Sequence, residues 1–327
     1  MDPSTSFDIE HFMSNWKQVC PRIRAVSPES DAEIVNSTSK ALELEPQYVK
    51  KFNFTGKYMI SDATGWREAF DSWLSNHASN NLSAETPVRV HQRQTLSSWN
   101  PDKHSPEFVR SFPRLFQHPL VTRRLAVSAL WNMEHKMNRT VVADSLVLAT
   151  NVSTVNNLTT GRIVRNGFMG AHLRVAADAV FAKFPGYESQ APFYLNEAQR
   201  QNLSTIYLAT GSPEHRERFR KDAKDIGMEV YTKEDLLEGD ELAYLKSLSW
   251  DQQALVDYDV LLHSSRFSGA VRSSFSWLLV SDRATLPEAQ YPWNFGENVE
   301  IKHYHDGLSA ISGNWSSNRP PVGTWPM

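Results

Sequence analysis

The chain contains a single cysteine, Cys20, so no disulfide can form within it. No apolar run approaches the roughly 20 residues that span a bilayer, and the start, MDPSTSFDIE, has neither the basic region nor the apolar core of a secretory signal. The formal net charge of -3 gives no general attraction to nucleic acid or to anionic membranes. We therefore expect no nucleic-acid partner, and membrane attachment only through an anchor upstream of Met1.

Metal-binding patterns are also missing from the sequence. No D-x-D pair stands where it would hold Mn²⁺ between phosphate oxygens, and no His/Cys cluster has the spacing of a zinc site. The sequence accordingly predicts no metal and no cofactor.

N-glycosylation triplets, in contrast, are in excess. Chance would give about three for this number of asparagines. Eight N-x-Ser/Thr triplets are present, beginning at Asn36, Asn53, Asn81, Asn138, Asn151, Asn157, Asn202 and Asn314. They favour the lumen of the secretory pathway, the endoplasmic reticulum or Golgi, with a targeting signal upstream of Met1. The alternative is a cytoplasmic protein rich in Asn, Ser and Thr whose true start is Met1.

Length and pattern together predict two domains, the first mostly helical and the second α/β. The 327 residues are 40% hydrophobic and 22% charged, as in an ordinary globular protein large enough for two cores. A polar stretch at 150–165 divides an N-terminal domain, 1–150, from a C-terminal domain, 151–327. In the first domain, apolar periodicity predicts helices at 66–74 and 121–137, and 88–90 has the pattern of a short strand.

The second domain alternates strand and helix patterns, which is typical of a parallel sheet covered by helices. Strands are predicted at 205–210 and 228–231, joined by a helix that starts at Gly211-Ser212-Pro213 and ends at Gly227. A second unit follows, with a helix at 252–256, a strand at 259–262, a turn at 265–269 and a helix from Ser273 to about Asp282.

Two segments of this domain carry groups suited to phosphate. His172 and Arg174 lie two apart at the end of the apolar stretch 167–174, so on a strand they would face one way and meet one anion. Ser273 and Ser274 open a helix behind a strand, where free N–H groups and hydroxyls also bind phosphate. Each group also has a purely structural alternative. Arg174 would pair with Asp178, the serines would form a helix N-cap, and His172 would be a half-buried side chain hydrogen-bonded within the protein.

These blocks resemble the protein O-fucosyltransferase superfamily, which uses GDP-fucose. The first block, His172-Leu173-Arg174 with Asp178, follows an H-L-R-x-x-x-D pattern. The others are Ala254–Tyr258, Phe267–Gly269 and Ser273–Ser276, at the family's spacing. The resemblance covers roughly 167–283. The segment 306–309 with Trp325-Pro326 resembles the tail of fungal members, and 7–12 is similar to a segment that follows the family's first helix.

The resemblance implies a GT-B architecture of two Rossmann-like domains, in which the C-terminal one holds the donor. It implies an inverting, metal-independent transfer of fucose from GDP-fucose to a hydroxyl of a protein or glycan. Arg174 would contact the β-phosphate and act as the catalytic group, and an arginine can replace a metal ion there. The resemblance assigns the remaining donor-binding roles to His172, Asp257, Ser273, Ser274 and Phe275, with Asp257 on the guanine edge.

One departure from the family leaves the activity open. The glycine-rich G-G-x-x-N-Q-R type segment that borders the family's active site is absent, so we expect the N-terminal domain to be partial and helix-rich. The chain is then either an active fucosyltransferase or a catalytically silent member that binds a nucleotide sugar or glycan. A third possibility is a cytosolic α/β protein that binds another phosphorylated ligand.

Overall fold

The computed structural model describes residues 5, 7–19, 42–44, 68, 71–72, 75–76, 90–92, 116–141, 163–181, 184–284 and 304–313. The chain forms two compact units, one of residues 1–8 and 116–326 and the other of residues 9–115 with the final residue. In the smaller unit the structure describes helix α1 (Ile9–Val19) and two short parallel strands, β1 (Leu42–Leu44) and β2 (Val90–Gln92). Of the predicted helix at 66–74 the structure describes only residues 68, 71 and 72, and all three are helical. Most of the stretch at 150–165 falls on residues outside this description, as do 88 and 89.

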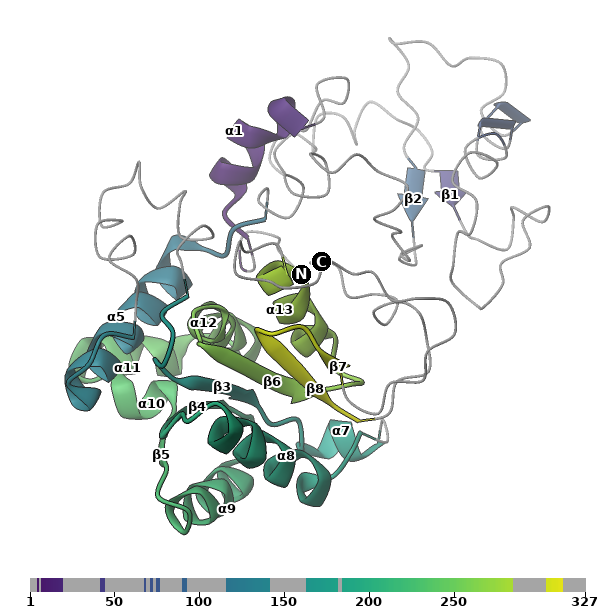
Figure 1. Ribbon diagram of the computed structural model, residues 1–327. Helices are drawn as coiled ribbons and strands as arrows, with labels where there is room; N and C mark the ends of the chain where they lie inside the picture. Colours follow the sequence, from purple (N-terminus) through teal and green to yellow (C-terminus); the bar gives the residue numbers. More distant parts are fainter. Residues whose placement is uncertain are drawn as a thin grey trace. The chain divides into compact units, whose positions relative to one another are not determined.

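The larger unit is built on a six-stranded sheet with the order β5-β4-β3-β6-β8-β7 (Figure 1). All its strands are parallel except β7, which pairs antiparallel with β8. Its strands are β3 (Met169–His172), β4 (Thr205–Ala209), β5 (Glu229–Tyr231), β6 (Arg266–Ala270), β7 (Tyr304–His305) and β8 (Ser309–Ser312). The helices described in this unit are α5 (Leu120–Met137), α7 (Ala177–Phe181), α8 (Tyr187–Arg200), α9 (Pro213–Lys224), α10 (Lys233–Leu236), α11 (Gly239–Ser247), α12 (Trp250–Leu262) and α13 (Ser274–Ala284).

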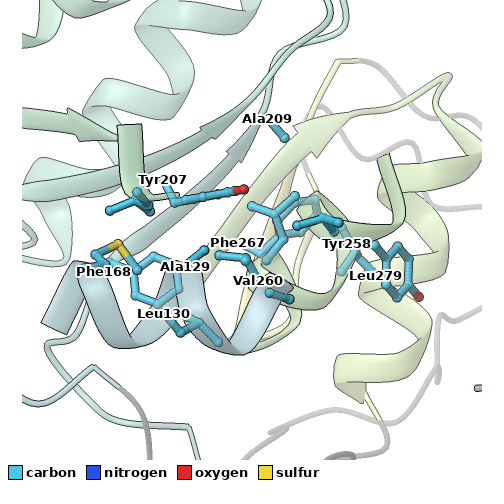
Figure 2. Close-up of a cluster of buried hydrophobic side chains, with 14 of the residues drawn as sticks. Ala129, Leu130, Phe168, Tyr207, Ala209, Tyr258, Val260, Phe267 and Leu279 are labelled. Atoms are coloured by element: carbon cyan, nitrogen blue, oxygen red, sulfur yellow. The ribbon is translucent and has the colours of Figure 1, made fainter. Parts of the chain in front are cut away.

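Helices cover both faces of this sheet, as Figure 1 shows, with α8 and α9 on one side and α5, α12 and α13 on the other. Alternate residues of the strands feed the two cores, because successive side chains of a strand point to opposite faces. Phe168 and Tyr207 pack with α5 and α12, in the cluster drawn in Figure 2. Met169 and Ile206 pack with α8 and α9. The expected α/β class with a parallel, Rossmann-like sheet is confirmed in this unit.

The unit β4-α9-β5 forms as the sequence predicts. Ser212 caps α9 by accepting a hydrogen bond from the N–H of His215, and Pro213 occupies the first turn, where its missing N–H costs nothing. Gly227, with a φ of +77°, makes the left-handed turn that leads into β5. The helix predicted at 121–137 is likewise confirmed as α5.

The second unit differs from its prediction in one respect: residues 259–262 are not a strand but the last turn of α12. The helix starts at a capping box between Ser249 and Gln252 and continues to His263. Its buried residues, Val256, Val260 and Leu261, follow the spacing of one helical face. The short apolar run Val260-Leu261-Leu262 fits a strand or a buried helix equally well, which is why the pattern was misleading.

The true strand, β6, occupies the segment predicted as a turn. Residues 266–270 are all buried, because β6 lies between β3 and β8 and has helices on both faces. Ser268 and Gly269 have the composition of a turn, but their small size suits a strand against which α13 packs closely. The buried guanidinium of Arg266 pairs with Glu197 at 3.1 Å, so this charge does not remain alone in the interior.

Helix α5 belongs to the larger unit, although the sequence analysis placed it before the boundary at residue 150. Its side chains Leu130 and Met133 are part of the core that α12 and the sheet share. At one end, His118 Nδ1 lies 2.7 Å from Asp259 Oδ1. At the other, Arg139 donates to the carbonyl oxygen of Gly167 at 2.7 Å. The division between the compact units therefore falls at residues 115 and 116 rather than at 150.

Arg283 joins three elements of this core from a fully buried position. Its guanidinium donates to the carbonyl oxygens of Leu262 (2.8 Å) and Leu308 (2.9 Å) and to Ser309 Oγ (3.2 Å). Burial lowers the pKa of Arg283 to about 9. The side chain thus holds α13 against the end of α12 and the start of β8, at the cost of an interior charge.

Candidate functional site

The strand order places the candidate site between β3 and β6. From β3 the chain proceeds outward to β4 and β5 and then returns to the other side of β3 as β6. In open α/β sheets, ligands bind outside the carboxyl ends of the strands at this point of reversal. His172 is the last residue of β3, and Ser273 lies three residues beyond the end of β6. Both predicted phosphate-binding segments therefore meet at this edge.

The segment after β6 forms the start of α13. Buried Ser273 caps the helix, since its Oγ accepts from the N–H of Ser276 at 3.2 Å. Ser274 is exposed and occupies the first helical position. The N–H groups of Ser274 and Phe275 belong to the first turn, where a helix has no intrahelical acceptor and carries partial positive charge. The N-cap reading is thus correct for Ser273, and it leaves the helix start able to receive an anion.

His172 reaches this helix start across the sheet. Its Nδ1 lies 2.9 Å from Ser276 Oγ and 3.5 Å from Ser273 Oγ, and its ring is 4.4 Å from that of Phe275. Burial, and then the charge of Arg174, lower the pKa of His172 to about 3, so the imidazole is neutral at physiological pH. His172 therefore adds no positive charge of its own beside Arg174.

The bond to Ser276 determines which nitrogen of this neutral ring is available to a ligand. Ser276 Oγ accepts from the N–H of Ala270 at 3.3 Å and has a hydroxyl proton that can bond Nδ1 of His172. In the tautomer in which Nδ1 accepts this proton, the ring proton resides on Nε2. His172 in that tautomer offers one uncharged N–H donor to a ligand.

Arg174 is held in place by its main chain. Its N–H donates to Gln190 Oε1 at 3.0 Å, and its carbonyl oxygen accepts from Gln190 Nε2 at 3.0 Å. Gln190 is fully buried on α8, and Tyr194, one turn later, donates to the carbonyl oxygen of His172 at 3.0 Å. These two positioning residues were missed by sequence reasoning, which examined only the motif blocks. The sequence offers one signal by which they could be found, a Gln and a Tyr four positions apart on the buried face of a helix.

The guanidinium of Arg174 pairs with Asp178, as the structural alternative proposed. It donates through two nitrogens to the two carboxylate oxygens, one of them at 2.9 Å, and these bonds lower the pKa of Asp178. Asp178 is 64% exposed and Arg174 21% exposed. Because an exposed carboxylate gains little from such a pair, a phosphate can compete for the guanidinium.

Asp257 lies in the interior, on α12, rather than at the edge of the sheet. Its Oδ1 accepts from the hydroxyl of Tyr207 at 2.8 Å, and its Oδ2 is 2.5 Å from Lys233 Nζ. Burial opposes the charge on Lys233, but the carboxylates of Asp257 and Glu234 together outweigh it and raise the pKa of the lysine. Both oxygens of Asp257 thus have partners within the protein, and the structure does not bring Asp257 together with His172 through any direct contact that it describes.

Asp257 also forms the segment Asp257-Tyr258-Asp259, a D-x-D triplet that the sequence analysis passed over. Residues two apart on a helix point in different directions. Asp259 accordingly faces His118, whereas Asp257 faces Lys233. In the described part of the chain, no three His, Cys, Asp or Glu side chains gather as a metal site would require.

A methyl group at Gly269 is expected to disrupt the site more than the fold. A Cβ there would fall on Ser276 Oγ and 2.6 Å from Ser276 Cβ, so α13 has to shift and Ser276 leaves His172. We expect Gly269→Ala to weaken GDP binding at least about tenfold, or 1.4 kcal/mol. Gly186→Ala is the matched control, because a Cβ there meets nothing within 4 Å. Equal GDP affinity in the two variants, measured by calorimetry, would contradict this description of the site.

Tyr258 connects the site to a titrating carboxyl group. Its ring is 5.4 Å from that of Phe275, and its hydroxyl donates to Asp282 Oδ2 at 2.5 Å. Burial raises the pKa of Asp282 from 3.8 to about 6, although the Tyr258 bond and the charge of His118 act in the opposite direction. The folded state therefore binds more protons than the unfolded state between about pH 4 and pH 6, and this group lowers stability as pH rises through that range.

Asp282→Asn removes this titration and keeps an oxygen that can accept from Tyr258. We expect the variant to gain stability relative to the wild type as pH rises from 4 to 6, with no further gain above pH 7. Thermal unfolding followed across this range measures the difference in Tm. A difference that does not change with pH would show that Asp282 titrates normally.

The sequence matches the model of a known protein family. The model of a family described as GDP-fucose protein O-fucosyltransferase matches residues 4–286, well over half of the chain. No curated protein sequence matches. None of the helices that the structure describes is long and apolar enough to cross a membrane.

Similar solved structures include two of POFUT1. The crystal structure of POFUT1 in complex with GDP-fucose (crystal form I) is 11% identical, with a TM-score of 0.47, over 95% of this chain and 83% of that chain. The high-resolution structure of POFUT1 in complex with GDP is 11% identical, with a TM-score of 0.45, over 86% of this chain and 80% of that chain.

Proposed function

The chain belongs to the GDP-fucose protein O-fucosyltransferase family, and we propose that it transfers fucose from GDP-fucose to a hydroxyl of a protein or glycan acceptor, with inversion and without a metal ion. The observation that carries the proposal is the meeting of His172 with the α13 start at the point where the strand order reverses. This location suits a nucleotide diphosphate on general grounds, independently of the family.

The proposed chemistry is the displacement of GDP from C1 of fucose. The acceptor oxygen bonds to C1 and loses its proton, while the bond from C1 to the β-phosphate oxygen breaks and its electron pair stays with GDP. Negative charge grows on that phosphate, so a fixed cation there lowers the barrier. Arg174 supplies this charge in place of a metal ion, because its planar guanidinium binds two phosphate oxygens at once.

The other donor-site residues hold the diphosphate in position. Ser274 and Phe275 offer main-chain N–H groups at the positive end of α13, and Ser274 adds an exposed hydroxyl. Neutral His172 donates from Nε2 and thereby adds a hydrogen bond without a second charge. Asp257 contacts the guanine edge only if Lys233 or Tyr207 releases one of its oxygens.

We place this activity in the lumen of the secretory pathway. The excess of N-x-Ser/Thr triplets supports that compartment. The single cysteine is compatible with a lumen or a reducing compartment and does not distinguish them.

A silent family member that binds the donor without turnover is the second candidate. The specific observation in its favour is that two side chains expected to bind the donor already have partners within the protein. Arg174 pairs with Asp178, and Asp257 bonds to Lys233 and Tyr207.

GDP release from GDP-fucose distinguishes the two candidates. With water as the acceptor, we expect slow GDP release that EDTA does not change, and no release of UDP from UDP-sugars. Binding of GDP-fucose without any release of GDP would favour the silent member. Failure to bind GDP at all would contradict both.

A further inference from the structure

Two of the eight N-x-Ser/Thr triplets lie in the described part of the larger unit, and both directly follow a helix. Asn138-Arg139-Thr140 begins at the residue after α5, and Asn202-Leu203-Ser204 begins two residues after α8. Both asparagines adopt left-handed backbone conformations, with φ of 47° and 53°. This conformation is one that asparagine tolerates well, and it turns the chain sharply at the helix end.

The two triplets share an arrangement in which the middle residue is anchored and the outer two are exposed. Arg139 is half-buried and donates to the carbonyl oxygen of Gly167, and Leu203 is buried in the core on the α8 face. In contrast, Asn138 and Thr140 are exposed, and so are Asn202 and Ser204. Each triplet therefore presents to solvent the amide and the hydroxyl that N-glycosylation uses.

Both triplets lie at the edge where the parallel strands begin. Arg139 donates to Thr205 Oγ1, at the first residue of β4, at 3.2 Å. The carbonyl oxygen of Ser204 accepts from the N–H of Glu229, the first residue of β5, at 2.9 Å. His172 stands at the opposite edge, separated by the length of a four- to five-residue strand, about 15 Å.

We propose that Asn138 and Asn202 carry N-linked glycans and that these glycans cover the edge of the sheet opposite the donor site. Each asparagine Nδ2 bonds to C1 of an oligosaccharide delivered on a polyprenyl diphosphate; the bond from C1 to the diphosphate breaks, the lipid diphosphate leaves, and the amide gives up one proton. The inference rests on the lumenal placement proposed above, but it does not depend on whether the chain binds GDP.

The test uses the full chain, expressed in eukaryotic cells behind a heterologous signal peptide. The secreted and cell-associated pools are digested with peptide N-glycosidase in H₂¹⁸O, which converts a glycosylated asparagine to ¹⁸O-labelled aspartate. Mass spectrometry then reads Asn138 and Asn202 separately from the other six triplets. The same chain without the signal peptide is the unmodified control.

We expect the label at both positions and its loss from Asn138 in Thr140→Ala and from Asn202 in Ser204→Ala, since these variants keep the asparagine and remove the hydroxyl. Unlabelled asparagine at both positions in lumenal protein would overturn the inference.

The proposed location is tested separately. We expect the double variant Asn138→Gln/Asn202→Gln and the wild type to bind GDP with affinities within about twofold of each other. A change of tenfold or more would place the glycans near the donor site and contradict the geometry. A wild type that carries both glycans but does not bind GDP would contradict the proposed function and leave the glycan sites standing.

Discussion

Arg174→Ala is expected to reduce GDP release from GDP-fucose by about 10²- to 10³-fold in kcat, the usual effect of removing one group that stabilises charge in the transition state. The reason is that the guanidinium supplies the positive charge proposed for the leaving phosphate, which His172 cannot supply because it is neutral, with a pKa of about 3. The fold should tolerate the change, because Gln190 holds the main chain of residue 174 whatever its side chain. Stopped-time assays at saturating GDP-fucose measure kcat, and thermal unfolding confirms that the variant is folded.

Two matched variants make the Arg174 result specific. Arg174→Lys keeps the charge but loses the two-pronged contact with phosphate, so we expect activity between that of the wild type and that of the alanine variant. Asp178→Asn removes the carboxylate that competes for the guanidinium, so GDP affinity should stay equal or rise. If Arg174→Ala retained full activity, the charge on the leaving phosphate would have to be neutralised elsewhere.

Arg283→Met is expected to have the largest effect on stability, a decrease of about 2–3 kcal/mol in the free energy of unfolding. Methionine fills much of the space but leaves the carbonyl oxygen of Leu262 without its Arg283 donor, and a buried unsatisfied group costs about 1–3 kcal/mol. The carbonyl oxygen of Leu308 loses one donor and keeps the N–H of Phe267. The lost bonds join α12, α13 and β8, so α13 should also move relative to His172.

Urea denaturation measures this change, with Arg200→Met as the control. Arg200 is 66% exposed, and its buried partner Glu197 keeps its pair with Arg266, so the control should lose only about 1 kcal/mol. Similar losses in the two variants would show that Arg283 contributes no more than a surface arginine. That result would follow if the stabilisation gained by removing a buried charge equalled the stabilisation lost with its hydrogen bonds.

The parts of the fold that the sequence predicts correctly are those with local signals. Ser212-Pro213 and Gly227 mark the ends of α9 by their own chemistry, and the strands beside it are apolar. The α12–β6 segment was misassigned because its signals are tertiary. Nothing local distinguishes the end of α12 from a strand, and residues 266–270 form a strand only because β3 and β8 lie on either side.

The candidate site shows the same division. The motif blocks around His172 and Ser273 were found by type and spacing, and the fold brings them together as expected. The hydrogen bonds within the site were not predictable, because the bonded residues are far apart in the sequence. The bond between His172 and Ser276 is an example. The interior positions of Asp257 and Lys233 also depend on how α10, α12 and β4 pack together. The spacing of residues in a sequence motif does not predict such packing.

The most direct test of the donor site is calorimetric titration of the purified chain with GDP and with UDP, repeated on Arg174→Ala. The account predicts that GDP binds, that UDP binds at least about tenfold more weakly, and that the substitution weakens GDP binding by a further factor of about ten or more. Binding of GDP that Arg174→Ala leaves unchanged, or no binding of GDP by the folded wild type, would contradict it.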